Sequence, residues 1–551
     1  MRTVQCSNTV LLVLLFSLAS CVPEDPGTDV LADEEETGQT TDALFYLNGS
    51  KWSSRNISVC WGASLQSGFS NDKGYVKAAL ESNQSWETAG NIDFVGWGNC
   101  VGGEDIRFEY LPGWVWETNA LGDSAGSSEI NVDFDSTVVS TTLRCSQNGL
   151  TRAQCIRAST LHEVGHALGF AHEQNRSDTP ASCTAPPADG NGDNEMGPWD
   201  AESIMSYCNL TSQLSAGDRI GLSKVYGRPK GPTRRLSDFN GDGTDDQMCR
   251  DGSNDVKLLD ASTNGYDVPG DPKDSYWMDT TCQNLLLPGD FNGDGKIDLL
   301  CVSPNTKLVD YWGYGNGNNA TWSTTWCASS GGQIHVGNFD GDLYDDLLCH
   351  NQTTGAFSID YGPTLSGANW TSPSSWCNAM DGVLFDENLY VGDVSGDGRD
   401  DLICHSTRTG VTKYDGADSS GQFSGANWTR SSGSPWCKGY NKEPYIGYFT
   451  NDARADLLCH DSESGTLELD RAAASPVFGS NPWQGNQYFC HATTQRLYTG
   501  DVNGDGRDDM VCHDIVSGVR EKYHATMSGT FSGSPTVLST PFCNTGYYRL
   551  F

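Results

Sequence analysis

The spacing of hydrophobic and polar positions predicts two kinds of structure in one chain. In the first part, residues 55–61 (RNISVCW) and 105–110 (DIRFEY) are typical of strands, and residues 74–89 have the apolar spacing of an amphipathic helix. Residues 129–134 (EINVDF) alternate apolar and polar positions, which predicts an exposed edge strand. An extended peptide could pair with such an edge as an added strand. These elements predict an α+β domain over residues 43–228.

In the second part, one segment recurs six times, at a spacing of 48 to 55 residues. The copies are Asp238–Cys249, Asp290–Cys301, Asn338–Cys349, Asp393–Cys404, Tyr448–Cys459 and Asp501–Cys512. Units of this length with several short strands predict the blades of a β-propeller. We therefore expect an all-β propeller over residues 237–551, with six blades rather than seven. Residues 547–551 (YYRLF) could supply a closing strand to the first blade.

The N-terminal residues have the pattern of a secretory signal. The apolar run 10–18 is too short to span a membrane, and Leu-Ala-Ser-Cys at 18–21 resembles a bacterial lipobox with Cys21 as the acylated residue. The alternative is ordinary cleavage near Ala19. Residues 22–42 are acidic and lack aromatic side chains, which predicts a disordered tether. A basic, proline-containing linker spans residues 229–236. The chain is expected outside the cell, either anchored to the outer membrane or secreted.

Charge excludes one class of partner. The chain has 71 acidic residues against 34 Lys and Arg, a formal net charge of −37. Nucleic acid is therefore not an expected partner, because phosphate binding needs a basic surface. Contact with a membrane is expected only through a lipid anchor.

The strongest chemical signal is the stretch 161–176, LHEVGHALGFAHEQNR, which contains HExxHxxGxxH. Residues four apart share a helix face, so His162 and His166 can direct two ring nitrogens at one metal ion. Gly169 can end the helix with a positive φ, after which His172 can supply a third ligand. Three neutral imidazoles leave the fourth position of tetrahedral zinc open, as in catalytic sites. Glu163 lies beside this face and can act as a general base.

Together with SIMSY at 203–207, this stretch resembles the astacin-like branch of the metzincin zinc endopeptidases. The resemblance implies a zinc-dependent endopeptidase with one Zn²⁺, which cleaves peptide bonds in proteins with a water that zinc activates and Glu163 deprotonates. It further implies that Met205 forms an apolar floor beneath the zinc ligands and that Tyr207 stabilises the transition state. Glu173 corresponds to a glutamate that contacts the N-terminus of the mature enzyme through water.

The chain also departs from the family pattern. Ser206 replaces the usual histidine, the segment between His172 and Met205 is short, and no propeptide of ordinary length precedes Trp52. The alternative function is an adhesive propeller protein with an inactive protease-like domain. The presence of every catalytic residue favours the enzyme.

The repeats carry candidate calcium loops. DFNGDGKIDLLC, from Asp290, has oxygen ligands at positions one, three, five and nine. This pattern is similar to that of an EF-hand calcium loop, but here a strand follows the loop in place of the helix. These repeats resemble the calcium-loop (integrin-type) repeats of extracellular propellers. The first, second, fourth and sixth copies keep the ligands. The third begins with Asn338 and has Leu343 in place of a glycine, and the fifth has Tyr448 and Thr450 at ligand positions, so about four Ca²⁺ are expected. The candidate ligands are Asp238, Asn240, Asp242, Asp246, Asp290, Asn292, Asp294, Asp298, Asp393, Ser395, Asp397, Asp401, Asp501, Asn503, Asp505 and Asp509. The alternative is ordinary Asp/Gly turns without metal. Such a propeller could bind the substrate, a surface or a glycan.

Cysteine usage predicts an exported protein with disulfides. Beyond Cys6 and Cys21, eighteen cysteines remain, six of them before residue 228. Local pairing would join Cys145 to Cys155 and Cys183 to Cys208, leaving Cys60 with Cys100, although six cysteines allow 15 pairings. Each repeat carries one pair of cysteines, which predicts one disulfide per structural unit.

Overall fold

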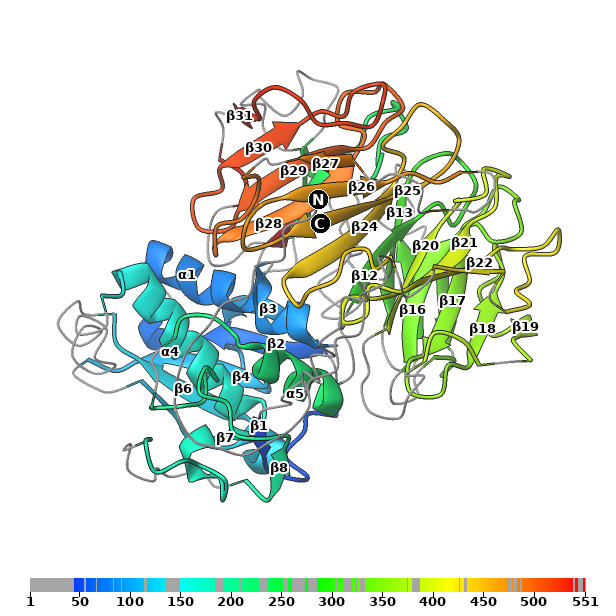
Figure 1. Ribbon diagram of the computed structural model, residues 1–551. Coiled ribbons are helices and arrows are strands. Elements are labelled where there is room, and N and C mark those ends of the chain that lie inside the picture. Colours follow the sequence, from blue (N-terminus) through cyan, green and yellow to red (C-terminus); the bar gives the residue numbers. More distant parts are fainter. Residues whose placement is uncertain are drawn as a thin grey trace, which may run out of the picture. The chain divides into compact units, whose positions relative to one another are not determined.

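A computed structural model describes residues 44–550 with several gaps, the longest being 135–148, 184–191, 227–235, 260–272, 276–284, 311–319 and 379–386. The described chain consists mostly of β-sheets, with few helices (Figure 1). The signal, the lipobox with Cys21, the tether and nearly all of the linker lie outside the described residues. None of the described helices is long and apolar enough to cross a membrane.

The N-terminal region, residues 44–226, is built on a five-stranded sheet in the order β3-β2-β4-β6-β5. The neighbouring pairs are parallel except for β5 and β6, which are antiparallel. The strands are β2 (Asn56–Trp61), β3 (Asp93–Asn99), β4 (Ile106–Tyr110), β5 (Glu117–Thr118) and β6 (Ser128–Val132). The strands predicted over 55–61 and 105–110 are therefore confirmed.

The prediction of an edge strand over 129–134 is wrong. β6 lies between β4 and β5, and Ile130 and Val132 on it are fully buried. The edge is the two-residue strand β5, which is too short to produce a periodic pattern. The apolar and polar positions of β6 alternate because one face of the sheet packs on the core and the other is more open. This pattern does not distinguish an edge strand from a strand with a neighbour on each side.

The longest helix, α4 (Arg152–Ala167), contacts β5 and β6 of this sheet. The other helices of the region are η1 (Ala63–Leu65), α1 (Ser70–Glu81), α2 (Trp86–Ala89), η2 (Gly122–Ala125), η3 (Glu173–Asn175) and α5 (Ala216–Tyr226). The single helix predicted over 74–89 is instead two helices. α1 ends at Ser82, whose backbone is extended, and Ser85 starts α2 with a capping box that includes Thr88. The Ser85 backbone N–H donates to Thr88 Oγ1 at 3.1 Å, which caps the start of the second helix.

A small second sheet lies at the end of α4. It has the order β7-β1-β8, with β1 (Leu44–Tyr46), β7 (Phe170–Ala171) and β8 (Asn194–Met196). All three residues of β1 are buried, and Phe45 pairs with Ala171. The first described residues of the chain thus hold the strand that leads directly into His172.

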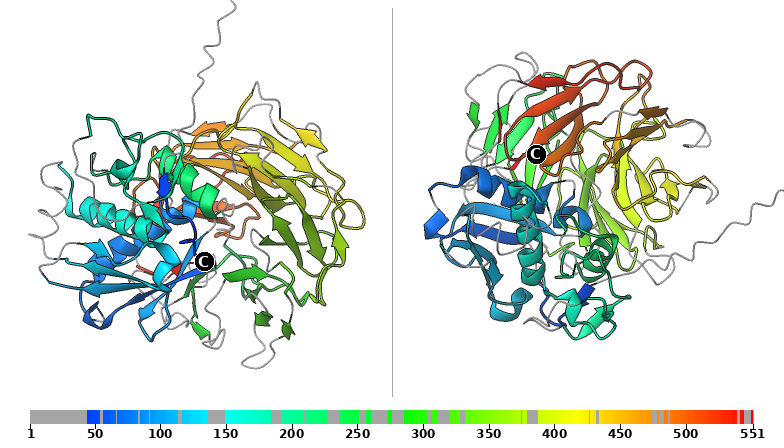
Figure 2. Two further views of the ribbon diagram at one scale, coloured as in Figure 1. Left: turned by 90° about the horizontal axis from the view of Figure 1, so that it is seen from below. Right: turned by 60° about the vertical axis from the view of Figure 1, so that its left-hand side comes forward.

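The repeat region, residues 236–550, forms six four-stranded antiparallel sheets in its described part, an arrangement compatible with a β-propeller (Figures 1 and 2). The first sheet has the order β11-β10-β9-β32, and each later sheet runs in chain order. The strands are β9 (Gln247–Arg250), β10 (Val256–Leu259), β11 (Lys273–Ser275), β12 (Leu285–Gly289), β13 (Asp298–Val302), β14 (Thr306–Asp310), β15 (Ala320–Ser323), β16 (Gly332–Gly337), β17 (Asp346–Asn351), β18 (Phe357–Asp360), β19 (Trp370–Thr371), β20 (Glu387–Gly392), β21 (Asp401–Ser406), β22 (Thr412–Asp415), β23 (Trp428–Thr429), β24 (Lys442–Gly447), β25 (Asp456–Asp461), β26 (Leu467–Asp470), β27 (Trp483–Gly485), β28 (Gln495–Gly500), β29 (Asp509–Asp514), β30 (Arg520–Tyr523), β31 (Thr536–Leu538) and β32 (Arg549–Leu550).

The first strands of the later sheets face a common cavity of about 390 Å³, lined by Gly289, Gly337, Gly392, Tyr445 and Thr499. In the first sheet, the strand in the equivalent place is β32, because it pairs with β9 at the end of the order. The C-terminal strand therefore completes the first sheet, as the sequence predicts.

The candidate calcium loops are joined into a closed ring of hydrogen bonds. The eighth residue of each loop donates its backbone N–H to the first residue of the loop in the preceding repeat, and Asp245 of the first repeat donates to Asp501 of the last. In four loops, an aspartate at position eight also accepts the N–H of that first residue. These aspartates are Asp245, Asp345, Asp400 and Asp508, at 2.7 to 2.9 Å. Neighbouring repeats are thus connected through their loops.

Disulfides connect successive units rather than closing each sequence repeat. Four join the second cysteine of one repeat to the first cysteine of the next, and Cys249–Cys543 joins the two ends of the region. The four are Cys327–Cys349, Cys377–Cys404, Cys437–Cys459 and Cys490–Cys512. The structural unit is therefore out of phase with the repeat as delimited in the sequence. In the N-terminal region, Cys60–Cys100 and Cys183–Cys208 are confirmed, whereas Cys145 lies outside the described residues. Several disulfides indicate an extracellular or secreted protein.

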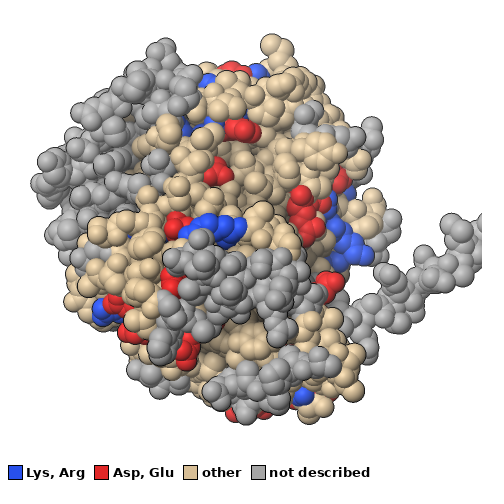
Figure 3. Space-filling view, turned by 90° about the vertical axis from the view of Figure 1, so that its left-hand side faces the viewer, with Lys and Arg blue, Asp and Glu red and all other residues tan. Residues whose placement is uncertain are grey.

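On the face shown in Figure 3, acidic side chains lie in several small groups with basic side chains among them.

Candidate metal centre

The three histidines of the motif come from α4 and from the segment that follows it. α4 begins with a capping box, in which the Thr151 side chain accepts a hydrogen bond from the Gln154 backbone and Gln154 bonds back to Thr151. His162, Glu163 and His166 lie in the last two turns, and all three are buried. The capped, buried helix fixes these side chains on one face.

Gly169 turns the chain back toward the helix. Its φ is +96°, and a Cβ atom there would lie 2.3 Å from Ser50 Oγ and 2.9 Å from the Tyr46 ring. Only glycine meets both conditions without strain. The chain then forms β7 and reaches His172, as the sequence predicts.

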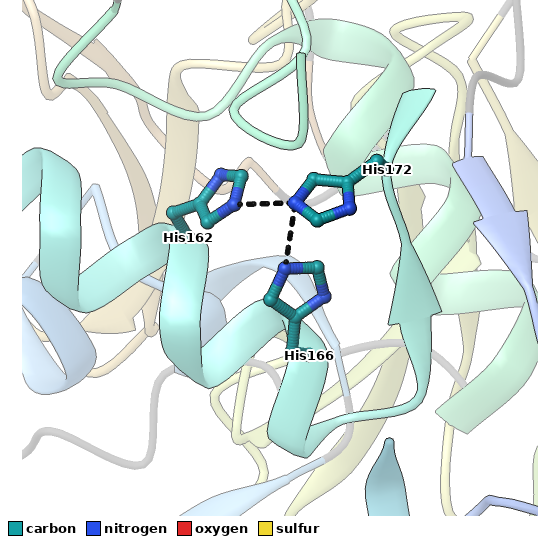
Figure 4. A group of neighbouring side chains, drawn as sticks. All are labelled: His162, His166 and His172. Atoms are coloured by element: carbon teal, nitrogen blue, oxygen red, sulfur yellow. Dashed lines mark hydrogen bonds between the residues drawn. The ribbon is translucent and has the colours of Figure 1, made fainter. Parts of the chain in front are cut away.

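The three imidazole rings direct their Nε2 atoms at one point (Figure 4). The Nε2 atoms of His162 and His166 lie 3.3 and 3.2 Å from Nε2 of His172. On the other side of the rings, Nδ1 of His162 donates to the Ile204 carbonyl at 2.8 Å, and Nδ1 of His166 donates to the Phe170 carbonyl at 2.7 Å. Such backbone contacts fix the tautomer that keeps the Nε2 lone pair for a metal.

This geometry fits a zinc ion. Two nitrogens on one tetrahedral zinc, each about 2.05 Å from it, are about 3.3 Å apart. With both Nδ1 atoms protonated, the facing Nε2 lone pairs would repel one another unless a cation lies between them. Burial lowers the pKa of His162 to about 3, helped by the nearby His172, and lowers the pKa of His166 well below its usual value. All of these features suit neutral ligands of a cation.

Glu163 follows the first histidine and contacts the edge strand. Thr118 of β5 places its hydroxyl oxygen 2.8 Å from the Glu163 carbonyl oxygen and 2.9 Å from carboxylate oxygen Oε2. Burial raises the pKa of Glu163 to about 8, against the hydrogen bonds from Thr118, which lower it. A carboxyl group in this environment is suited to accepting and releasing a proton.

Tyr207 lies on the histidine cluster. Its ring stacks on His162 at 5.2 Å between centroids, and lies 4.6 Å from the His172 ring. The side chain is 49% exposed, so it borders solvent rather than the core. Partial burial and the nearby carboxyl groups of Glu163 and Glu117 raise the pKa of Tyr207 above its usual value. It therefore remains a proton donor at neutral pH.

Met205 lies beneath the helix that carries the ligands. It is fully buried, and a Cβ atom on Gly165 would lie 2.4 Å from its sulfur. The small Gly165 thus lets the methionine sulfur pack closely against the helix that carries His162 and His166.

Sequence reasoning missed two residues that support the site, Thr118 and Asp218. The buried Asp218 carboxylate accepts hydrogen bonds from the Ser203 hydroxyl at 2.7 Å and from the backbone N–H groups of Ile204 and Ser215, at 2.8 and 2.9 Å. It thereby holds the turn before Met205. The Ser-x-x-Asp pattern of residues 215–218 is a capping box and could have revealed it. No comparable local signal marks Thr118.

Glu173 is fully buried and pairs with a side chain of the same segment. Its Oε1 accepts the Asp200 N–H at 3.1 Å and lies 3.3 Å from Arg176 Nε. Arg176 in turn donates to the Leu44 carbonyl of β1 and pairs with Asp178. The family resemblance implies contact between Glu173 and a mature N-terminus, whereas in this chain a guanidinium lies beside the carboxylate.

The predicted calcium loops adopt tight turns. In the first, second, fourth and sixth loops, the aspartate at position one accepts backbone N–H groups from positions four to six. These aspartates are Asp238, Asp290, Asp393 and Asp501. The glycines at positions four and six have positive φ values of 71° to 87°. In the third loop, the Asn338 side-chain oxygen accepts only the Gly341 N–H of these three groups. The fifth loop begins with Tyr448, which has no carboxylate or amide oxygen at this place. Oxygen donors in such turns suit Ca²⁺.

Metal-ligating side chains converge within 4.8 Å at three places in the described chain. One is the histidine cluster, and the others are Cys60, Cys100 and Glu104, and Cys377, Glu387 and Cys404. The cysteines of the latter two groups form disulfides, so those groups are not ligand sets. The loop carboxylates do not converge to this degree.

Comparison with known proteins supports the repeat assignment. A family model described as FG-GAP-like repeat matches residues 290–349. The chain carries the integrin-type repeat. No curated protein matches it.

Three solved structures resemble parts of the chain. An Agrocybe aegerita lectin that recognises non-reducing terminal N-acetylglucosamine is 15% identical over 60% of this chain and 87% of its own, with a TM-score of 0.41. Myroilysin is 22% identical over 33% of this chain and 98% of its own, with a TM-score of 0.25. The rhamnogalacturonan lyase YesW is 12% identical over 54% of this chain and 69% of its own, with a TM-score of 0.22. At these scores, none of them carries an argument about function.

Proposed function

We propose that this protein is an extracellular zinc-dependent endopeptidase of the astacin-like metzincin type. One observation carries the proposal. Three buried imidazoles direct their Nε2 atoms at one point with 3.2 and 3.3 Å separations, beside the buried carboxyl group of Glu163. This set of side chains supplies three neutral nitrogen ligands and a base, the combination used by hydrolytic zinc sites.

The chemistry divides between the ion and the side chains. Zinc, when held by His162, His166 and His172, would acidify a water molecule and polarise the scissile carbonyl. Glu163 takes a proton from that water and passes it to the leaving amine. The Tyr207 hydroxyl donates to the negative charge that develops on the carbonyl oxygen, a contribution often worth about 100- to 1000-fold in rate.

The substrate is an extended polypeptide. β5 is the edge of the five-stranded sheet, and its Thr118 contacts Glu163. A peptide paired with this edge would pass beside the proposed base, with its main chain held by strand hydrogen bonds. Recognition through the main chain suits an enzyme that cuts proteins at internal positions.

The repeat region is proposed to be a six-bladed propeller with Ca²⁺ in four loops, which binds the substrate, a surface or a glycan. Its support is the six four-stranded sheets and the ring of loop contacts. The alternative is an adhesive protein with an inactive protease-like domain, and the complete set of site side chains favours the enzyme.

Cleavage of an unfolded protein by the full exported chain tests the proposal. The expected result is new peptide termini that are absent with Glu163→Gln and present with Glu202→Gln, an exposed glutamate of the same region. Mass spectrometry of the products would report the cut sites. Absence of cleavage by a zinc-loaded wild-type chain would favour the adhesive alternative.

A further inference from the structure

The short edge strand β5 is fixed on both sides of Thr118. Its residues pair with β6, where Thr118 lies opposite Ile130. Trp116, just before the strand, is 4% exposed and donates from Nε1 to the Asp133 carbonyl at 3.0 Å. After the strand, the Asn119 N–H donates to the Glu129 carbonyl at 3.0 Å. The backbone at Thr118 is therefore anchored, although the strand has only two residues.

Thr118 uses this position to reach across to α4. Its hydroxyl oxygen lies within 2.9 Å of two oxygens of Glu163, one in the backbone and one in the carboxylate. A hydroxyl has one proton, so it can donate to only one of these two oxygens at a time, and donation to the carboxylate holds Oε2. The β-branched side chain has few rotamers, which makes the hydroxyl position well defined.

The Glu163 side chain needs such a partner. A glutamate has several rotatable bonds, and holding it in one rotamer costs conformational entropy. Thr118 is the one side chain among the described residues that donates a hydrogen bond to this carboxylate. Because Oε2 is held by Thr118, Oε1 is left to take a proton from water.

We propose that Thr118 is a positioning residue, whose hydroxyl holds the Glu163 carboxylate in the orientation in which it acts as the base. This inference rests on the proposed peptidase function and deepens it. It also connects two parts of the site, since the strand that would pair with the substrate is the strand that orients the base. Substrate and base are therefore aligned by the same element.

Three variants test the proposal. Thr118→Val removes the hydroxyl and keeps the shape of the side chain, and Thr118→Ser keeps the hydroxyl. The control, Thr160→Val, removes a buried hydroxyl from α4, the helix that carries Glu163, where it donates to the Ile156 carbonyl. For Thr118→Val we expect kcat to fall about 10- to 100-fold, less than the roughly 100- to 10,000-fold that a general base contributes, because the base is still present, while KM changes less than about twofold. Thr118→Ser and Thr160→Val should keep kcat within about threefold of wild type.

Two further readouts separate positioning from a general loss of structure. Zinc affinity, measured by competition with a chelating dye, should be the same in Thr118→Val and wild type. The thermal unfolding midpoint of Thr118→Val should match that of Thr160→Val, since each change removes one hydroxyl that makes hydrogen bonds within the fold. A wild-type kcat in Thr118→Val, or an equal loss of kcat in Thr160→Val, would overturn the proposal.

A crystal structure of Thr118→Val makes the test independent of activity. The proposal expects the Glu163 carboxylate to leave its position in Thr118→Val and to keep it in Thr118→Ser. An unmoved carboxylate in Thr118→Val overturns the positioning role even if the wild-type chain proves active. Absence of cleavage by wild type, with a displaced carboxylate in the variant, would instead reject the proposed peptidase function alone.

Discussion

Single residues at the end of α4 combine several constraints. Gly169 has a φ of +96° and closely approaches Ser50 and Tyr46, while Gly165 makes room for the Met205 sulfur. Neither glycine would bind zinc, yet both decide where the ligands lie. The position of His172 depends on the turn at Gly169 as much as on its own side chain.

Gly169→Ala should therefore destabilise the chain and weaken zinc binding. The left-handed backbone costs about 1 to 2 kcal/mol for a residue with a Cβ atom, and the contact with Ser50 adds to it, so we expect a loss of roughly 3 kcal/mol. Thermal unfolding and zinc titration measure both effects. Gly126→Ala is the matched control, because φ there is +73° and nothing lies within 4 Å of the added atom. Equal losses in the two variants would contradict the role of Gly169.

At this scale, local sequence patterns predict the site well where its residues are close in the chain. His162, His166 and His172 fall within eleven residues, and their spacing alone gives their geometry. Thr118 is 45 residues from Glu163, and only the strand pairing of β5 with β6 brings them together. Such a contact depends on tertiary structure and leaves no periodic trace.

At the scale of elements, the sequence predicts some strands correctly and misses one helix boundary and one short strand. β2 and β4 follow from their apolar runs, whereas the boundary between α1 and α2 depends on serine caps, and β5 is too short to have a period. The sequence also did not predict which cysteines of the repeats pair, because the second cysteine of each repeat lies between two candidate partners along the chain. Packing of successive sheets decides which one it meets.

The second strand of four repeat sheets carries a buried histidine that anchors the next connection. The ring Nε2 atoms of these histidines donate to a backbone carbonyl, which belongs to the residue before the disulfide cysteine in three units and to Cys437 itself in the fourth. The histidines are His350, His405, His460 and His513. The cysteines of these four connections have φ values of 48° to 58°. A buried imidazole therefore holds the connection in each of these four units.

The stability of the repeat region should depend on pH through His513. Burial lowers its pKa to about 4 in the folded chain, against about 6.5 when unfolded. Between these values the unfolded chain binds more protons, so the free energy of unfolding falls as the pH is lowered through this range. At pH 5, this group alone should cost about 2 kcal/mol relative to pH 7.5.

Urea unfolding of wild type and His513→Gln at both pH values measures this effect. The variant should show a pH dependence that is smaller by about that amount. His491→Gln, at an exposed histidine, should behave as wild type does. A variant with the full pH dependence of wild type would show that His513 is not the titrating group.

For the molecule as a whole, the repeat region is closed by covalent and non-covalent links between its ends. Cys249–Cys543 spans 294 residues, β32 completes the first sheet, and Asp245 contacts Asp501. A disulfide, a strand pairing and a loop hydrogen bond thus all join the first repeat to the last. Closure of the repeat region does not depend on the β32 strand alone.

Removing the long-range disulfide should cost more than removing a local one. The Cys490–Cys512 pair spans 22 residues. Loop-closure entropy favours the longer bridge by up to about 2 kcal/mol. Paired Cys→Ser variants at each bridge, compared by denaturant unfolding, measure the difference. A smaller loss at Cys249–Cys543 than at Cys490–Cys512 would mean that β32 and the loop ring close the structure without it.

The central claim is tested most directly by removing and restoring the metal while cleavage of an unfolded protein is followed. The full exported chain would be stripped with a chelator in constant calcium and then titrated with zinc. The account predicts no cleavage by the stripped chain and full recovery at one zinc per chain, with Glu163→Gln binding zinc but recovering nothing. Cleavage that persists in the stripped chain, or a wild-type chain that binds one zinc and cuts nothing, would contradict it.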